Sequence, residues 1–349
     1  MTLWLPTPIA VVFGRARGCV RCVEDVLEWA DTQGCSAGAA FTQSASRGCA
    51  MPRVAIVTGG ASGIGRALSA SLVRRGDQVI IADVEGAAAV QVAEQLTAVG
   101  PGAASAAAVD VRDAEAVSAL VTDTAARHGH LDLMFNNAGL GIGGPVEELT
   151  PAHWDRAIDV NLRGVVHGVH AAYPVMLRQG SGHIINTASL AGLLPIPGSA
   201  PYGTTKWAVV GLSLSLRGEG APRGVRVSVV CPGGVDTPIL DKGMPPDLPR
   251  VPTAEATDTR AVITKLSGGH LYGADALAAD VLRGVDRNRA IIVAPRQARI
   301  MWRLMRLSPA LLMRLGAAMT ARDSDTGPAR GAAIPAPRSG AVASERAAG

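Results

Sequence analysis

The sequence predicts an α/β fold, a doubly wound parallel sheet of about seven strands in a single domain with flexible terminal extensions. Short runs of β-branched and apolar residues alternate with longer stretches of helical periodicity, as strands alternate with helices in such a sheet. Hydrophobic residues make up 48% of the 349 residues and charged residues 18%, which is ample for a large core. The predicted strands are 53–58, 79–83, 104–110, 131–136, 183–188, 225–231 and 290–294.

The first predicted strand runs into the glycine-rich turn Thr58–Gly65, and helical spacing of apolar residues follows from Arg66. A strand, a glycine turn and a helix N-terminus together present backbone N–H groups to a pyrophosphate. The chain has 41 glycines, so such a turn can arise by chance, but its flanking elements favour a dinucleotide site. The contacts expected from the turn are Gly59, Ser62, Gly63, Ile64 and Gly65.

The second predicted strand ends in Asp83, eighteen residues after Gly65. A carboxylate at this place accepts hydrogen bonds from the adenosine ribose hydroxyls and repels a 2′-phosphate. Neither Ser62 nor Val84 offers a cation that could bind that phosphate. The sequence therefore predicts NAD as the cofactor, with an NADPH-dependent ketoreductase as the alternative.

Tyr202 and Lys206 are four residues apart in a predicted helix, so they lie on one face of it. A free tyrosine has a pKa near ~10, and an adjacent cation favours the phenolate and lowers that value. Pro201 suits the first helical position, which would place Tyr202 near the positive end of the helix dipole. The pair is a plausible acid/base device, although the same spacing occurs on ordinary exposed helices.

Over residues 53–295 the chain resembles the short-chain dehydrogenase/reductase family, which has a Rossmann fold. The glycine turn is similar to the family's Thr-Gly-x-x-x-Gly-x-Gly, and Tyr202 and Lys206 match its Tyr-x-x-x-Lys. Five further motifs follow the family's order. They are Asp110-Val111 after the third strand, Asn136–Gly139 after the fourth, Asn161, Ser189 thirteen residues before Tyr202, and Pro232–Thr237 after the sixth strand.

The resemblance implies hydride transfer between NAD(H) and an alcohol or ketone, with four catalytic residues. Tyr202 would be the general acid/base, and Lys206 would lower its pKa and bind the nicotinamide ribose. Ser189 would donate to the substrate oxygen, and Asn161 would hold a water that connects Lys206 to solvent. The implied cofactor contacts, besides the glycine turn, are Asp83, Asp110, Val111, Asn137, Ala138, Gly139, Tyr202, Lys206, Pro232, Gly233, Val235 and Thr237. A protein that senses NAD without turnover is the rival interpretation, which the intact catalytic set disfavours.

Residues 51–295 are the predicted catalytic domain, in which 239–275 corresponds to the family's variable lobe over the substrate. The helices at about 152–179 and 200–219 match the family's usual interface, so we expect a homodimer or homotetramer. The lobe carries few charges and seven large apolar residues, which predict a lipophilic secondary alcohol or ketone as substrate. They are Met244, Leu248, Val251, Val262, Ile263, Leu266 and Leu271.

Residues 1–50 lack periodicity, and we expect a disordered or mis-started extension or a small accessory element. Cys19 and Cys22 have neither a second close cysteine pair nor histidines nearby, so no metal site is predicted. Two prolines interrupt the apolar stretch Leu3–Phe13 and no basic residue precedes it, which argues against a signal peptide and for a cytoplasmic protein. A net charge of +4 without a dense basic block argues against nucleic acid as a partner.

Residues 296–319 are predicted to form a basic amphipathic helix, and residues 320–349 a disordered tail. The helix can contact an anionic membrane surface through residues 296–314, or pack on its own subunit or a neighbour. No run of apolar residues is long enough to span a bilayer. The arginines that define its basic stripe are Arg296, Arg299, Arg303 and Arg306.

Overall fold

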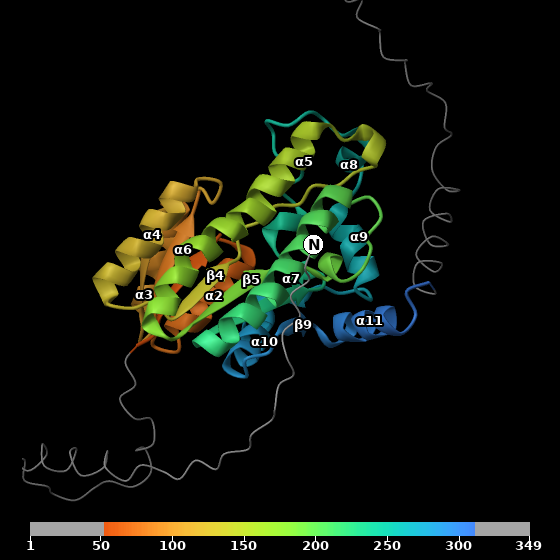
Figure 1. Cartoon of the computed structure of the whole chain (residues 1–349). Coiled ribbons are helices and arrows are strands. Elements are labelled where there is room, and N and C mark those ends of the chain that lie inside the picture. Colours follow the sequence, from red (N-terminus) through yellow and green to blue (C-terminus); the bar gives the residue numbers. More distant parts are fainter. Residues whose placement is uncertain (1–51, 311–349) are drawn as a thin grey trace, which may run out of the picture. The chain divides into compact units, whose positions relative to one another are not determined.

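The computed structural model describes residues 52–310 (Figure 1). The chain divides into two units between Met51 and Pro52, and the described residues belong to the second unit. The predictions for residues 1–50, including the pair Cys19 and Cys22, and for the tail 320–349 lie outside the described residues.

Seven parallel strands form the central sheet in the order β3-β2-β1-β4-β5-β6-β9, which confirms the predicted doubly wound fold. Every strand begins and ends within two residues of its predicted bounds, because the apolar β-branched runs mark the buried strands directly. The strands are β1 (Val54–Thr58), β2 (Gln78–Asp83), β3 (Ala103–Ala108), β4 (Leu133–Asn136), β5 (Gly182–Thr187), β6 (Val225–Pro232) and β9 (Ile291–Ala294).

Both faces of the sheet are covered by helices, so the alternating side chains of β1 enter two different cores. Ala55 and Val57 belong to one apolar cluster, and Val54 and Ile56 belong to the other. The first cluster lies under α2 (Gly63–Val73), α3 (Gly86–Val99) and α10 (Ala274–Asp286). The second lies under α4 (Ala114–His128), α6 (Gly164–Gln179) and α7 (Ala200–Gly220), as Figure 1 allows the reader to follow.

Strand order reverses between β1 and β4, since the chain goes outward from β1 through β2 and β3 and then resumes beside β1. The segments after these two strands diverge at the carboxyl edge of the sheet and leave a crevice where ligands bind in open α/β sheets. The glycine turn follows β1 and Asn136–Gly139 follows β4, so the fold brings two of the predicted motifs to this crevice.

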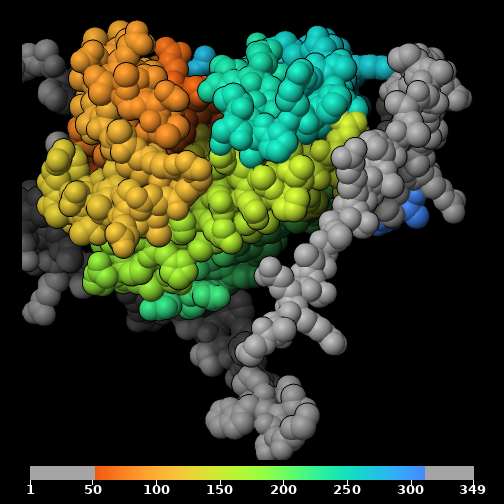
Figure 2. All heavy atoms as spheres, turned by 90° about the horizontal axis from the view of Figure 1, so that it is seen from above, coloured from red at the N-terminus to blue at the C-terminus, as the bar shows by residue number. Residues whose placement is uncertain are grey.

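A lobe stands at the carboxyl edge, built from 145–158 and from the segment between β6 and α10. Its elements are η2 (Val146–Glu148), α5 (Pro151–Ile158), η6 (Pro238–Leu240), α8 (Pro252–Glu255), α9 (Thr259–Leu266) and the short pair β7 (Val235–Asp236) and β8 (Tyr272–Gly273). Arg156 pairs with Asp247, and the Glu148 carboxylate accepts hydrogen bonds from the backbone and hydroxyl of Thr253. In Figure 2 the cyan segment accordingly lies against the yellow-green segment that contains α5.

The last described helix, α11 (Arg296–Leu307), is shorter than predicted. It ends before Pro309, which disfavours helical geometry at Ser308, so a single helix over 296–319 is not what forms. Residues after 310 lie outside the described part. No helix within 52–310 combines the length and apolar composition that a bilayer span requires.

Candidate active site

The conformation of the glycine loop between β1 and α2 requires residues without a side chain. Gly59 and Gly63 have φ angles of 61° and 50°, a left-handed conformation that other residues rarely adopt. A Cβ at Gly65 would lie 2.0 Å from the carbonyl oxygen of Gly59, so the position requires glycine. The N-cap of α2, Ser62, makes no side-chain capping bond, and the first turn contains no acid. Ile64 packs against the first core, and the N–H groups of this turn fit an anionic ligand.

Thr58, the last residue of β1, ties the glycine loop to the segment after β4. Its buried hydroxyl accepts hydrogen bonds from the N–H groups of Asn137 at 2.9 Å and Ala138 at 3.1 Å. The Asn137 side chain returns a bond from Nδ2 to the Thr58 carbonyl at 3.0 Å. Sequence reasoning did not assign this role to Thr58, although a hydroxyl at the end of a central strand is a signal for it.

Asp83 lies beside the glycine loop at the end of β2. Its carboxylate accepts hydrogen bonds from the backbone N–H groups of Ala61 at 3.0 Å and Glu85 at 3.1 Å. These bonds fix the carboxylate at the carboxyl edge of the sheet, next to the loop that would bind a pyrophosphate. The arrangement is what the prediction of a ribose-binding acid requires.

Asp110 and Val111 follow β3, the edge strand beside β2. Asp110 pairs with Arg112, with Oδ2 and Nη2 2.5 Å apart, and this guanidinium holds the pKa of the carboxyl below its usual range. Val111 is buried against α6, because a Cβ at Gly164 would lie 2.7 Å from its side chain. The Val111 carbonyl oxygen also lies 2.9 Å from Nδ1 of His167.

Asn161 lies in η3 (Asp159–Arg163), a π-helical turn between α5 and α6, and is fully buried. Such turns often occur at functional sites. Its Oδ1 accepts from the N–H of Leu140 at 2.9 Å, and its Nδ2 donates to the Leu140 carbonyl at 3.0 Å. The side-chain amide therefore holds the backbone that follows Asn136–Gly139, an engagement that the sequence did not predict.

Lys206 is 3% exposed and extends from α7 toward the end of β5. Its Nζ donates to the Thr187 carbonyl at 3.0 Å. A Cβ placed on Gly139 would lie 3.1 Å from Oδ1 of Asn161 and 3.4 Å from Nζ of Lys206, so both groups border the same glycine. Burial lowers the pKa of Lys206 to about 8, which leaves most of the ammonium protonated at neutral pH.

Tyr202 and Ser189 complete this group. The Lys206 ammonium lies 5.5 Å from the centroid of the Tyr202 ring. Burial raises the pKa of Tyr202, and a hydrogen bond with Ser189 opposes that rise. Desolvation of the phenol is the largest effect on this pKa, and the sequence pattern cannot show it. The expected lowering of the Tyr202 pKa by Lys206 stays a prediction.

The loop after β6 lies between the glycine loop and α11. Pro232 pairs with Ala294 of β9, and the buried Thr237 lies 3.3 Å from where a Cβ on Gly63 would be. Val235 is buried in the first core. Arg260 of α9 binds both the Asp236 and Asp241 carboxylates, each at 2.6 Å, and thereby clamps the lobe to the loop. Sequence reasoning missed Arg260, since nothing local marks a partner nineteen or more residues away.

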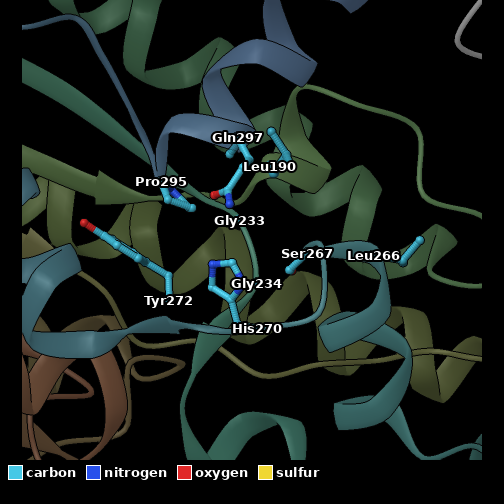
Figure 3. A pocket seen from close by; sticks show the side chains of 10 residues that line it. Leu190, Gly233, Gly234, Leu266, Ser267, His270, Tyr272, Pro295 and Gln297 are labelled. Atoms are coloured by element: carbon cyan, nitrogen blue, oxygen red, sulfur yellow. The ribbon is translucent and has the colours of Figure 1, made fainter.

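A pocket opens beside this loop (Figure 3). Leu190, which follows Ser189 in the chain, and Gly233 form part of its wall, whereas Ser189, Tyr202 and Lys206 themselves do not line it. The start of α11 also lines it, which was not predicted for a segment outside the substrate lobe. The lining residues are Leu190, Gly233, Gly234, Leu266, Ser267, His270, Tyr272, Pro295, Gln297 and Ala298.

Two further observations concern possible metal ligands and the thiol of Cys231. Within residues 52–310, no three His, Cys, Asp or Glu side chains are grouped so that they could hold a metal ion. Cys231 is fully buried in β6, where it packs as a small apolar side chain, and burial raises the pKa of its thiol to about 12. Neither feature adds a nucleophile to the site.

Comparison with known proteins agrees with the resemblance. The sequence model of the short chain dehydrogenase family matches residues 53–245, a span that contains all the predicted catalytic and cofactor residues. Cyclohexanol dehydrogenase of Acinetobacter sp. (strain SE19) is 38% identical over 189 residues, which are 54% of this chain and 75% of that protein. Levodione reductase of Leifsonia aquatica is 38% identical over 195 residues, 55% of this chain and 73% of that protein.

A similar fold is found among solved structures. A short chain dehydrogenase/reductase from Burkholderia phymatum, solved in complex with NAD, has a TM-score of 0.67 and 30% sequence identity to this chain. The similarity covers 75% of this chain and 95% of that one. The predicted Rossmann fold and family resemblance are therefore confirmed.

Proposed function

Since the chain belongs to the short chain dehydrogenase family of oxidoreductases, we propose that it transfers hydride between NAD(H) and a lipophilic secondary alcohol or ketone. One observation carries this proposal. Asn161 and Lys206 border Gly139, Lys206 lies 5.5 Å from the Tyr202 ring, and Tyr202 bonds to Ser189. The four predicted catalytic residues thus form one continuous group at the carboxyl edge of the sheet.

Tyr202 is the proposed general acid/base. In oxidation its phenolate oxygen accepts the proton of the substrate alcohol, and in reduction its hydroxyl donates a proton to the substrate oxygen. The Ser189 hydroxyl donates to the same oxygen, where negative charge develops. Ser189 Oγ also accepts from the N–H of Ala191 at 3.2 Å, which orients its hydroxyl.

Lys206 supplies the positive charge beside Tyr202. Its Nζ uses one of three donors on Thr187, so two remain for a ribose hydroxyl or a water. With a pKa of about 8, the ammonium is charged at neutral pH and favours the phenolate electrostatically during proton transfer. Because Leu140 occupies both side-chain groups of Asn161, a relay water would bind the main-chain carbonyl of Asn161.

NAD fits the residues at the crevice, and when bound it supplies the hydride acceptor or donor. The glycine loop and the uncapped start of α2 would hold the pyrophosphate. The Asp83 carboxylate would accept hydrogen bonds from the ribose hydroxyls and would repel the 2′-phosphate of NADP. We therefore propose NAD over NADP, and a cytoplasmic location where that cofactor is available.

The substrate class rests on the lobe and the pocket. Val251 of the lobe is fully buried, whereas Val262 and Leu266 are 44% and 57% exposed on α9. Leu190 and Leu266 add apolar surface to the pocket wall. Cyclohexanol, for which one relative is named, is a cyclic secondary alcohol, and levodione, for which another is named, is a dione. A lipophilic alcohol or ketone of this kind suits the surface better than a polyol.

Assembly into a homodimer or homotetramer is proposed from α7. Trp207 and Leu214 on this helix are 47% and 40% exposed, and they are seven positions apart, so they share one face. A Cβ on Gly211 would meet no atom within 4 Å, which leaves room for a neighbouring helix. A monomeric mass in light scattering would contradict this part of the proposal.

The function is tested by NADH formation from NAD with the purified full chain. Lipophilic cyclic secondary alcohols should be oxidised faster than polyols, and the reverse order would overturn the substrate assignment. The rival function, sensing of NAD, would appear as cofactor binding without turnover of any alcohol or ketone in the panel. Asp83→Asn should lower the preference for NAD over NADP by about tenfold or more, since it removes the charge that repels the 2′-phosphate.

A further inference from the structure

The outward face of α11 exposes a stripe of large apolar side chains. Ile300, Leu304 and Leu307 are 48%, 49% and 82% exposed, and their spacing of four and three residues places them on one face of the helix. Met301, 41% exposed, lies at the edge of this stripe. A contiguous apolar surface of this kind on a folded protein marks an interaction site.

The opposite face of α11 anchors the helix to the domain. Ala298 is 4% exposed, and a Cβ placed on Gly233 would lie 3.2 Å from the Cβ of Ala298. Trp302, one turn later, packs against the second core cluster. The helix is therefore held by one face, and the stripe of Ile300, Leu304 and Leu307 is not needed for that packing.

Positive charge is concentrated in the same segment. Residues 296–322 contain six arginines and no acid, whereas the rest of the chain has 27 basic and 29 acidic residues. Arg303 and Arg306 are exposed on α11 beside the stripe, and the Arg306 guanidinium lies 5.5 Å from the Trp302 ring centroid. The net positive charge of the protein thus resides in this segment.

The positive charge of this segment favours some binding partners of the stripe over others. A second copy of the chain, docked symmetrically, would bring the same row of arginines against itself, and α11 offers no acid to neutralise it. An anionic lipid surface fits both features. Its apolar boundary can bury the stripe, and its phosphate groups can pair with the arginines.

We propose that α11 docks the protein on the surface of anionic lipid bilayers. The helix lies in the plane of the bilayer, with Ile300, Leu304 and Leu307 in the headgroup boundary and Arg303 and Arg306 on lipid phosphates. Pro295, Gln297 and Ala298 line the pocket, so docking brings the pocket within about one helix diameter of the lipid. A lipophilic substrate could then enter from the bilayer, a consequence that rests on the proposed function.

The test is flotation of the full chain with phosphatidylcholine vesicles, with and without phosphatidylglycerol. The protein should float with the anionic vesicles, and added salt should weaken its binding. Replacing Arg303 and Arg306 by Ala should reduce the partition coefficient roughly thirtyfold. Ile300→Ser with Leu304→Ser should reduce it about tenfold or more. The matched controls are Arg127→Ala and Val99→Ser, both at exposed positions on other helices.

Flotation does not depend on turnover, so the outcome separates this proposal from the proposed function. The proposal is overturned if the protein floats equally with neutral vesicles, or with neither kind. It is also overturned if the two serine substitutions change the mass of the protein in solution without changing flotation, because the stripe would then join two copies of the chain.

Discussion

Replacing Lys206 by Met should make the protein more stable at neutral pH while abolishing turnover. Burial lowers the pKa of this lysine from 10.5 to about 8, so the folded state disfavours its charged form. A tenfold change in a proton equilibrium corresponds to ~1.4 kcal/mol, which gives a cost of about 3 kcal/mol for keeping the ammonium charged. The side chain is 3% exposed, so solvent screens little of that cost.

Part of the gain is offset, because methionine leaves the Thr187 carbonyl without the bond that Nζ donates at 3.0 Å. An unsatisfied buried acceptor costs about 1–2 kcal/mol, so the net stabilisation is about 1–2 kcal/mol. For a domain of this size we expect the melting temperature to rise by about 3–6 °C. Stability would then have been sacrificed for activity at this position.

The pH dependence of the protein's stability tests independently whether the charge on Lys206 destabilises the folded state. Between the folded pKa of about 8 and the unfolded value of 10.5, the unfolded chain binds more protons, so the wild-type protein gains stability as pH rises. Below the folded pKa both states are protonated and the cost is constant. The advantage of Lys206→Met should therefore be largest near neutral pH and shrink through this window.

Thermal unfolding followed by circular dichroism at neutral and at alkaline pH measures both effects. Lys242→Met, at an exposed lysine, is the matched control and should change the melting temperature little at either pH. The reasoning is refuted if Lys206→Met destabilises the protein at neutral pH, or if its effect does not vary with pH.

Three further changes test the contacts around the site. Thr58→Val should destabilise the protein by about 2–4 kcal/mol in chemical denaturation, because two partly buried N–H groups lose their acceptor. Thr58→Ser keeps the hydroxyl and should cost less. Gly65→Ala should abolish NADH binding in a fluorescence titration, since the new Cβ would lie 2.0 Å from the carbonyl oxygen of Gly59. An NADH affinity equal to that of the wild type would show that the loop is not the cofactor site. Arg260→Ala should change the free energy of unfolding little, because solvent screens its ion pairs, yet raise KM by loosening the lobe. An unchanged KM would exclude that clamping role.

Much of this architecture follows from local sequence signals. Runs such as Val54–Thr58 are apolar, β-branched and buried along their whole length, so their pattern identifies a central strand without other information. The glycine loop is predictable in the same way, because the left-handed φ angles at Gly59 and Gly63 favour glycine, which the sequence has at both positions. The order of the motifs predicts Ser189, Tyr202 and Lys206 from the sequence alone.

Features set by long-range packing could not be predicted in this way. Asn161 is recognisable by its motif, but its bonds to Leu140 depend on a π-helical turn that no propensity indicates. The raised pKa of Tyr202 comes from burial, which the spacing to Lys206 does not reveal. Gln297 lines the pocket because the chain after β9 turns back toward the loop after β6, a consequence of sheet order.

The central claim is that the Tyr202 hydroxyl transfers the proton, while most of the contacts that bind the cofactor come from other residues. Its most direct test compares NADH affinity and turnover in Tyr202→Phe, which keeps the ring and removes the hydroxyl. The account predicts an affinity within about threefold of wild type and a turnover lower by ~10²-fold or more, the usual contribution of a general acid/base. Turnover within about tenfold of wild type, with NADH binding intact, would contradict it.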